Sequence, residues 1–314
     1  MGSIVRSLLQ IAPAEATFAR RRFRGASEPA RERLEEVGRT FLVGYHAALE
    51  GGAADEVAAR LAGVETERRG FAFEGAAMGL ALLDRLAPVG GGRFARFLAG
   101  PGDAHRYMLH VGAGWAMARL PFGLERALGR MDPLLRWLAL DGYGFHEAYF
   151  HPGRTVTRGR VPRRLAGYAR RAFDQGVGRG LWFACGADPE AAARAVARFD
   201  AARHGDLWAG VALAAAYAGG AGRDGLESLA RAGVRHPADL AQGAAIAAGA
   251  RLRAGNPAPH TDQACRVFCG RGAPEAGRAA LDEARRAAPR GELPAFEAWR
   301  LRLRLRFLQS PALA

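Results

Sequence analysis

The stretch Gly210-Val-Ala-Leu-Ala-Ala-Ala-Tyr-Ala-Gly-Gly220 is an apolar run that opens on a glycine, and similar runs recur along the chain. The corresponding glycines, here called the ladder glycines, are Gly44, Gly75, Gly112, Gly142, Gly176, Gly210 and Gly243. Their spacings by subtraction are 31, 37, 30, 34, 34 and 33 residues, a period typical of paired-helix repeats. The pattern predicts an all-α protein of about seven helical hairpins, either a TPR-like solenoid or an α/α toroid.

Two kinds of helix are expected in each unit. The apolar runs predict first helices of about 12 residues. Asp188 as N-cap and Pro189 at the first turn predict an amphipathic second helix over 190–199. Similar second helices are predicted from Leu226 and from Ala276. A glycine inside a helix costs roughly 0.5–1 kcal/mol relative to alanine, so we expect neighbouring helices to approach closely at the ladder glycines. The alternative is chance, because the chain contains 42 glycines.

The domain organisation is predicted to be simple. Residues 1–40 are rich in arginine and read as an N-terminal capping segment, and residues 41–314 read as a single α-helical repeat domain. The stretch 299–307 alternates apolar and basic residues and could form either a strand or a terminal helix. No run of 18 apolar residues lacks charges, so no transmembrane segment is predicted. With three cysteines and no secretory signal pattern, the expected location is the cytoplasm.

The formal net charge of +14 raises the possibility of an anionic partner. The chain has no lysine, so all 45 basic residues are arginines, spread over many predicted helices. The two densest groups are at 20–24 and at 300–306, and neither has the interleaved aromatic platforms of a single-strand binder. We therefore predict no nucleic-acid partner and a largely solvated basic face, which would also suit an acidic or carrier-bound substrate.

The absence of lysine excludes several classes of enzyme. A Walker-type NTPase and a Schiff-base enzyme both require a lysine. There is no Gly-x-Ser-x-Gly elbow and no His-Glu-x-x-His motif. Gly176-Val-Gly-Arg-Gly180 resembles a dinucleotide loop only superficially, because no strand precedes it.

No metal and no cofactor are predicted. His260, Cys265 and Cys269 lack a fourth ligand at a zinc-binding spacing, so buried thiols on a helix face are expected. His146 and His151 are five residues apart, about 140° around a helix, and Pro152 follows. That spacing does not make a helical metal clasp.

The candidate site consists of polar and aromatic residues near the ladder glycines. If the first helices stack in one layer, equivalent positions should line one face of that layer. A carboxylate among aromatic rings can have a raised pKa and act as a general acid. The alternative is structural, since such residues also cap helices and form ion pairs. The candidate catalytic residues are Asp141, His146, Glu147, Asp174 and Asp206, and the candidate binding residues are Glu74, His110, Tyr143, Tyr149, Gln175, Arg179, Trp182, Trp208 and Tyr217.

Several segments also resemble a known family. They are Gly70-Phe-Ala-Phe-Glu-Gly-Ala-Ala-Met-Gly79, Asp141-Gly-Tyr-Gly-Phe-His-Glu-Ala-Tyr-Phe150, Arg171-Ala-Phe-Asp-Gln-Gly-Val-Gly-Arg-Gly-Leu-Trp-Phe183, the run from Asp206 to Gly220, and His260-Thr-Asp-Gln-Ala-Cys-Arg266. Over residues 15–307 the chain is similar to the UnbL-type proteins encoded in bacterial enediyne biosynthesis clusters. The resemblance implies secondary metabolism near a polyketide synthase that makes a linear polyene. It implies no particular reaction or catalytic residue.

Three functions remain open at this point. The first is an accessory protein that binds, and possibly transforms, a linear apolar polyene in an aromatic and acidic cavity. The second is a helical-repeat scaffold that docks a synthase or another pathway protein. The third is an α/α-barrel cyclase or isomerase that uses general acid chemistry. An enclosed cavity would favour the first and third. For a catalytic site, Glu147→Gln or Asp174→Asn should abolish activity with little effect on thermal stability.

Overall fold

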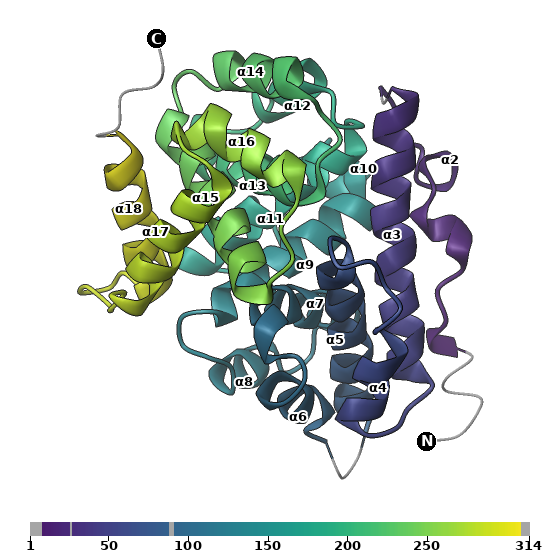
Figure 1. Ribbon diagram of the computed structural model, residues 1–314. Helices are drawn as coiled ribbons and strands as arrows, with labels where there is room; N and C mark the ends of the chain where they lie inside the picture. Colours follow the sequence, from purple (N-terminus) through teal and green to yellow (C-terminus); the bar gives the residue numbers. More distant parts are fainter. Residues whose placement is uncertain (1–7, 26, 88–90, 309–314) are drawn as a thin grey trace.

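The computed structural model describes residues 8–25, 27–87 and 91–308. Long and short helices alternate along the chain (Figure 1). Within these residues there is no β-strand, and the only extended pairing is an isolated bridge between Arg290 and Leu293. The predicted all-α class and hairpin repeats are therefore confirmed.

The long helices form one continuous layer, in which each helix packs against the next one along the chain. All seven ladder glycines lie within these helices, as the sequence pattern predicts. The helices are longer than the expected 12 residues because each apolar run is extended at one or both ends by polar residues. They are α3 (Glu28–Leu49), α5 (Arg69–Leu86), α7 (Arg106–Arg119), α9 (Arg136–Phe150), α11 (Tyr168–Ala184), α13 (His204–Ala218), α15 (Pro237–Ala254) and α17 (Ala273–Arg285).

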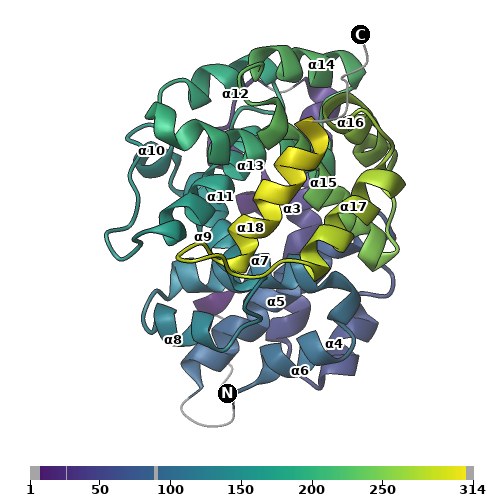
Figure 2. The same cartoon turned by 90° about the vertical axis from the view of Figure 1, so that its left-hand side faces the viewer.

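The short helices connect successive long helices. Figure 2 shows α12 and α14 at the top of the layer, and α4, α6 and α8 at the bottom. The Asp188 side chain accepts hydrogen bonds from the backbone N–H groups of Glu190 and Ala191, which confirms it as the predicted N-cap. The short helices are α4 (Ala54–Arg60), α6 (Arg93–Ala99), α8 (Leu124–Gly129), α10 (Pro152–Thr155), α12 (Pro189–Val196), α14 (Arg223–Ala232) and α16 (Pro259–Cys269).

The predicted second helix around Ala276 is a helix, but it belongs to the layer of long helices and not to the short connecting helices. It is part of α17, which packs along α15, and Gly277 lies against the backbone of Ala248 there. Its amphipathic pattern arises because the last long helix has no further unit to cover its outer face.

The ladder glycines mark the closest approach between long helices. A Cβ atom added at Gly44 would lie 1.7 Å from the carbonyl oxygen of Ala72, and one at Gly176 would lie 1.8 Å from that of Asp141. No side chain can occupy such a position unless the backbones separate. The close helix approach expected from the sequence is therefore confirmed, and it places Cα–H groups against carbonyl oxygens of the neighbouring helix.

A second glycine in several helices completes this packing. Gly142 faces Val111 of α7, whereas Gly144, two residues later, faces Phe173 of α11. In α11, Gly176 and Gly178 divide in the same way between α9 and α13. Because residues two apart lie on nearly opposite sides of a helix, a Gly-x-Gly pair lets one helix approach both of its neighbours.

The row of long helices curls so that its start, at α3, meets α13 and α15. Arg33 of α3 donates from Nε to the carbonyl oxygen of Ala218, 2.6 Å away, and forms an ion pair with Glu67. Arg251 of α15 donates to the carbonyl oxygens of Glu67 (2.9 Å) and Tyr217 (2.6 Å). These contacts, here called the seam, join the first two units to the sixth and seventh. The face enclosed by the curl is therefore packed with side chains instead of forming an open groove.

Both ends of the described chain pack on this frame. The N-terminal segment contains η1 (Pro13–Ala16) and α2 (Phe18–Arg21) and lies on α3, which itself runs through the predicted boundary at residue 40. The alternating stretch 299–307 belongs to α18 (Ala295–Leu308), a helix that packs on α15 and α17 (Figure 2). Across the described residues, no helix combines the length and hydropathy needed to cross a bilayer.

Candidate functional site

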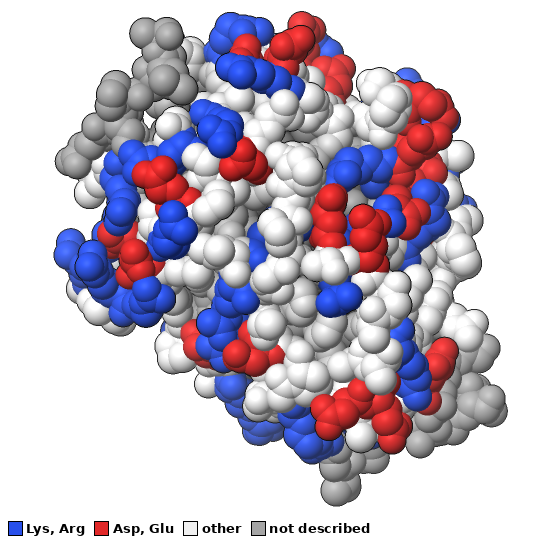
Figure 3. Space-filling model, viewed as in Figure 1, with Lys and Arg blue, Asp and Glu red and all other residues white. Residues whose placement is uncertain are grey.

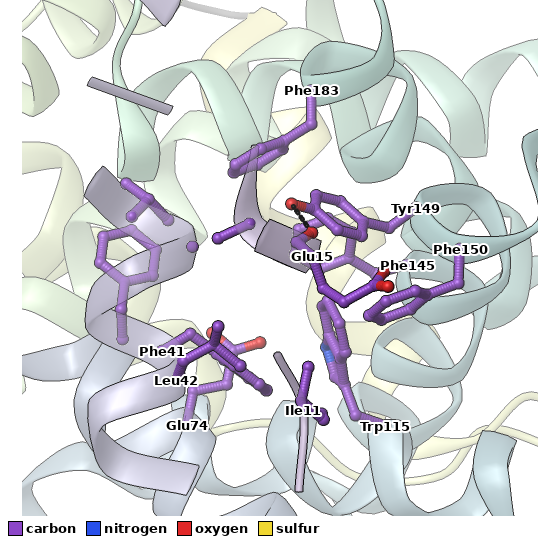
Figure 4. Close-up of a pocket in the computed structure, with 14 residues that line it drawn as sticks. Ile11, Glu15, Phe41, Leu42, Glu74, Trp115, Phe145, Tyr149, Phe150 and Phe183 are labelled. Carbon is purple, nitrogen blue, oxygen red and sulfur yellow. Dashed lines mark hydrogen bonds between the residues drawn. The ribbon is translucent and has the colours of Figure 1, made fainter. Parts of the chain in front are cut away.

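An aromatic pocket lies between the N-terminal segment and the first five long helices (Figure 4). The cavity itself is narrow, about 40 Å³, within about 500 Å³ of space between atoms that includes open solvent. Six different elements contribute to it, so it exists only in the curled fold. It is lined by Ile11, Glu15 and Ala16 of the N-terminal segment, Val37, Gly38, Phe41 and Leu42 of α3, Phe71 and Glu74 of α5, Trp115 of α7, Phe145, Tyr149 and Phe150 of α9, and Phe183 of α11.

Trp115 is the centre of the aromatic lining. The centroid of its ring lies 4.8 Å from that of Phe41 and 5.0 Å from that of Phe145. Phe145 in turn contacts Phe183 at 5.2 Å, and Tyr149 contacts Phe150 at the same distance. Mixed edge and tilted packing of this kind leaves ring faces available to an apolar ligand.

The N-terminal segment covers one side of the pocket. Tyr45 of α3 donates a hydrogen bond of 2.6 Å to the carbonyl oxygen of Leu9, and Tyr149 donates a longer one of 3.4 Å to that of Glu15. The Glu15 side chain is paired with Arg20 and Arg21. These contacts hold Ile11 and Ala16 against the rings.

Glu74 is the buried acid of the pocket. Its side chain is 1% exposed and lies beside Phe41 and Leu42 (Figure 4). Oε1 of Glu74 and Nε1 of Trp115 form no hydrogen bond of good geometry among the described residues, although the indole N–H lies near enough to the carboxyl to favour its charged form. Burial raises the pKa of Glu74 to about 8, although Arg179 and Trp115 favour the charged form. At neutral pH the carboxyl is therefore mostly protonated and can donate a hydrogen bond.

A buried ion pair lies behind Glu74. Arg179 of α11 contacts Asp141 of α9 at 2.6 Å, and Gln175 donates from Nε2 to the other carboxylate oxygen at 2.8 Å. The Arg179 guanidinium also lies 4.8 Å from the centroid of Phe145. Three residues predicted from the sequence thus meet at the inner end of the pocket.

The charges around Glu74 explain why its carboxyl is protonated. Arg179 and Asp141 neutralise each other, so an ionised Glu74 would give this buried group a net charge of −1. A buried net charge is costly because few dipoles replace the lost water. Protonation of Glu74 removes that charge. The group of Glu74, Asp141 and Arg179 is thus electrically neutral around pH 7 and carries one exchangeable proton.

Comparison with known families gives one match. Residues 1–307 match the family described as "Protein of unknown function (DUF1702)". The chain belongs to this family. Searches among curated proteins and among solved structures find no match.

Asp174 and Asp206 lie outside the pocket, and arginines hold both of them. Arg203 donates to Asp174 from Nε (2.9 Å) and from a terminal nitrogen (2.5 Å). Burial raises the pKa of Asp174, and Arg203 opposes that effect. Asp206 contacts Arg171 at 3.0 Å and Arg300 at 2.7 Å. These carboxylates join helices to each other.

Asp206 belongs to a larger ion-pair group beneath α18, here called the α18 network. Arg300, whose side chain is fully buried, also contacts Glu297 at 3.1 Å and donates from Nε to Gln242 at 3.0 Å. Burial alone would raise the pKa of Asp206, but Arg300 and Arg171 lower it below its usual value. Tyr168, Arg171 and Arg304 complete the network.

The remaining predicted binding residues are dispersed through the core. Trp182 donates from Nε1 to the carbonyl oxygen of Gly219 at 2.8 Å, and Trp208 packs against Gly233. Tyr217 lies under the Arg251 guanidinium, 4.3 Å away, at the seam. His110 contacts the carbonyl oxygen of Arg106 within α7, and Tyr143 packs on the ring of Phe173 of α11.

His146 and Glu147 lie near the pocket but face away from its interior. The His146 ring packs on Phe150 and Trp115, with centroids 4.8 and 5.6 Å away. Ligand atoms of His146, Glu147 and His151 all lie within 4.8 Å of one another. The prediction of no metal clasp assumed a helix continuing through residue 151, whereas α9 ends at Phe150.

Cys265 and Cys269 are buried on a helix face, as predicted. In α16, Sγ of Cys269 lies 3.3 Å from the carbonyl oxygen of Ala241, and Cys265 lies beside that of Ala244. His260 is turned away from both thiols, with Nε2 3.0 Å from the carbonyl oxygen of Tyr217 at the seam.

The arginine clusters are largely ion-paired. Arg302 and Arg306 contact Glu283 at 3.4 and 3.2 Å, and the other two arginines of α18 belong to the α18 network. On the face shown in Figure 3, acidic and basic side chains lie next to each other in several groups, with uncharged residues between the groups. The net positive charge is therefore dispersed among pairs instead of forming one phosphate-binding field.

Sequence reasoning identified Glu74, Tyr149, Asp141, Gln175 and Arg179 but missed most of the pocket lining. The missed residues are Phe41, Phe71, Trp115, Phe145, Phe150, Phe183 and the covering N-terminal segment. Phe145 and Tyr149, four residues apart on one face of α9, gave a local signal. The others converge only through the curl of the helix row, for which the sequence has no local signal.

Proposed function

We propose that this protein binds a linear, largely apolar small molecule in the aromatic pocket, with its one polar group against Glu74. The observation that carries the proposal is a pocket of aromatic rings that contains one unpaired buried acid. Such a site suits a ligand with a long apolar body, because the rings bury apolar surface. A solely structural core would not be expected to leave Glu74 Oε1 without a partner.

The two unpartnered atoms restrict the polar group of the ligand. Protonated Glu74 and the indole N–H of Trp115 can both donate to one acceptor, so a carbonyl or hydroxyl oxygen fits better than a carboxylate next to Asp141. Resemblance to the UnbL-type proteins supports a polyene of enediyne-type polyketide biosynthesis. The partner would then be the polyketide synthase or a neighbouring pathway protein, in the cytoplasm.

The first test is native mass spectrometry and organic extraction of the protein, purified alone and after expression beside its neighbouring synthase. We expect a conjugated molecule to co-purify from the second preparation. The blocking variant is Ala16→Phe, because Ala16 lines the pocket, and the matched control is Ala14→Phe on the exposed side of the same η1 turn. Loss of the ligand in Ala16→Phe alone would support the proposal.

A defined probe makes the test independent of the natural ligand. A fluorescent linear tetraene alcohol should bind the purified protein and quench Trp115 by energy transfer. The expected result is saturable binding that Ala16→Phe weakens at least tenfold. Absence of binding, or equal binding by Ala16→Phe and Ala14→Phe, would overturn the proposal and leave the scaffold function as the better explanation.

A second candidate function is acid-catalysed isomerisation of a bound polyene, favoured by the raised pKa of Glu74. Glu74 would give its proton to one alkene carbon, and its carboxylate would remove a proton from another carbon, which restores the acid and moves the double bond. Aromatic rings stabilise the intermediate cation. Reaction in D₂O should place one deuterium in the product, and Glu74→Gln should abolish that incorporation while the tetraene probe still binds.

A further inference from the structure

We propose that His146, Glu147 and His151 form a surface-accessible site for a divalent transition-metal ion of the zinc class. The site lies where α9 ends and α10 begins. Its three side chains supply two imidazole nitrogens and one carboxylate, a donor set that zinc and related ions prefer. The inference does not depend on what binds in the aromatic pocket.

The end of α9 creates the cluster. Within a helix, residues 146 and 151 would diverge, but His151 has φ −127° and ψ 47° and leaves the helical path. Pro152 then starts α10 in a new direction. The turn brings the two imidazole rings to a centroid distance of 6.0 Å, with the Glu147 carboxylate close to both.

The buried ligand atom lacks another role. His146 is 4% exposed, and its Nδ1 has no hydrogen-bond partner among the described residues. The nearest charged atom is Oε1 of Glu147, 3.4 Å away. An unpartnered nitrogen on a buried histidine is unusual, and here it faces the two other candidate ligands. A bound cation would satisfy it.

The geometry is close to that of an occupied site. Ligand atoms in a tetrahedral zinc site with bonds of about 2.0–2.1 Å are roughly 3.4 Å apart, compared with a separation of at most 4.8 Å here. His151 is exposed and can close the difference by a small rotation. Because the cluster opens to solvent on that side, the fourth position would hold water or an exogenous ligand.

Positive neighbours limit the affinity. Arg119 of α7 acts on His146, and Arg154 of α10 acts on Glu147. Arg119 donates to Tyr45 at 3.3 Å, which directs it away from the cluster. We therefore expect moderate binding that weakens when the negative charge of Glu147 is removed.

The test is isothermal titration of chelator-treated full-length protein with ZnCl₂, repeated with CoCl₂ in the spectrophotometer. One ion per chain should bind to the wild type. Binding should weaken at least tenfold in His151→Ala, an exposed change that spares the core, and in Glu147→Gln. The control is His236→Ala, because His236 is also a histidine beside a carboxylate, Asp239 at 3.2 Å, and that carboxylate is occupied by Arg304.

Three results would count against this metal site. No saturable zinc binding below about 100 μM would overturn the proposal. Unchanged affinity in both His151→Ala and Glu147→Gln would overturn it too, as would a cobalt–thiolate charge-transfer band, which would place the ion at the cysteines. A visible cobalt spectrum without that band, lost in His151→Ala and kept in His236→Ala, would support the site.

Discussion

Glu74 and the acids of the α18 network are equally buried, yet their surroundings give them opposite properties. Glu74 has aromatic neighbours and a nearby arginine already committed to Asp141, so its pKa rises to about 8. Asp206 and Glu297 share Arg171 and Arg300, and Glu297 also contacts Arg304. Burial alone would raise the pKa of Glu297, but Arg300, Arg304 and Arg171 lower it. The comparison teaches that the number of available partners, more than burial, separates a reactive acid from a structural one.

Both kinds of acid are held in place by the close packing of the long helices, and Gly176→Ala should disrupt that packing between α9 and α11. The added Cβ would meet the carbonyl oxygen of Asp141 at 1.8 Å, so α9 and α11 must separate. We expect a loss of about 3–5 kcal/mol in the free energy of unfolding. Urea denaturation measures it. Gly129→Ala is the control, because no atom lies within 4 Å of its added Cβ, and an equal loss there would contradict the packing argument.

Removing Arg300, the arginine that contacts both Asp206 and Glu297, should have the next largest effect on the free energy of unfolding. Arg300→Met leaves Asp206 and Glu297 buried with fewer partners, so we expect the free energy of unfolding to fall by about 3–5 kcal/mol. Arg306→Met on the same helix removes a half-exposed arginine paired with Glu283, and should cost less than ~1 kcal/mol. Similar losses in both variants would show that the network has no special role.

Replacing the two kinds of acid with their amides sharpens the comparison directly. Asp206→Asn removes the charge that balances Arg300 and Arg171, and should cost about 2–3 kcal/mol at pH 6. Glu74→Gln replaces a neutral acid by a neutral amide and should change the free energy of unfolding by less than ~1 kcal/mol near pH 4. At pH 6 it should stabilise the protein by up to ~2 kcal/mol, because wild-type Glu74 must take up a proton to fold at that pH. Thermal unfolding at pH 6 measures both, and a large loss for Glu74→Gln would mean that this carboxyl is charged in the fold.

As pH rises, the contribution of Glu74 to the free energy of unfolding should fall, whereas the contributions of Asp206 and Glu297 should grow. The pKa of Glu74 is about 8 in the fold against a usual 4.5, so its stabilising contribution is present below pH 4.5 and disappears as pH rises through 8. The difference amounts to at most ~5 kcal/mol. Asp206 and Glu297 have lowered pKa values, so their contribution is present above about pH 4 and disappears in acid.

Unfolding of wild type, Glu74→Gln and Asp206→Asn between pH 3 and 9 checks these signs. We expect Glu74→Gln to gain stability over the wild type progressively as pH rises from about 4.5 to 8. We expect Asp206→Asn to approach the wild type only in acid. Parallel curves for all three proteins would contradict the opposite assignments of the two acids.

The fold could be predicted because its signal is local and repeated. Each ladder glycine reports a close helix contact within its own run, and Asp188 with Pro189 gives the start of a short helix. The function of individual acids could not be predicted in this way. Asp141, Asp174 and Asp206 occupy similar places in the repeat, but their partners Arg179, Arg203 and Arg300 come from different elements.

The expectation for Asp174→Asn changes for this reason. Since two hydrogen bonds from Arg203 end on Asp174, we now expect that variant to lose stability instead of losing activity alone. Glu147 forms no ion pair with an arginine among the described residues and lies beside His146 and His151 instead. Its change to glutamine should therefore leave the fold intact.

The seam fixes how many units the protein can have. In an open array, evolution can duplicate or delete a hairpin, because each hairpin contacts only its neighbours. Here Arg33 must reach Ala218 and Arg251 must reach Glu67, so inserting or removing one hairpin would move both partners out of register. Homologues should therefore vary in loop length and surface residues while keeping the same number of hairpins between α3 and α15.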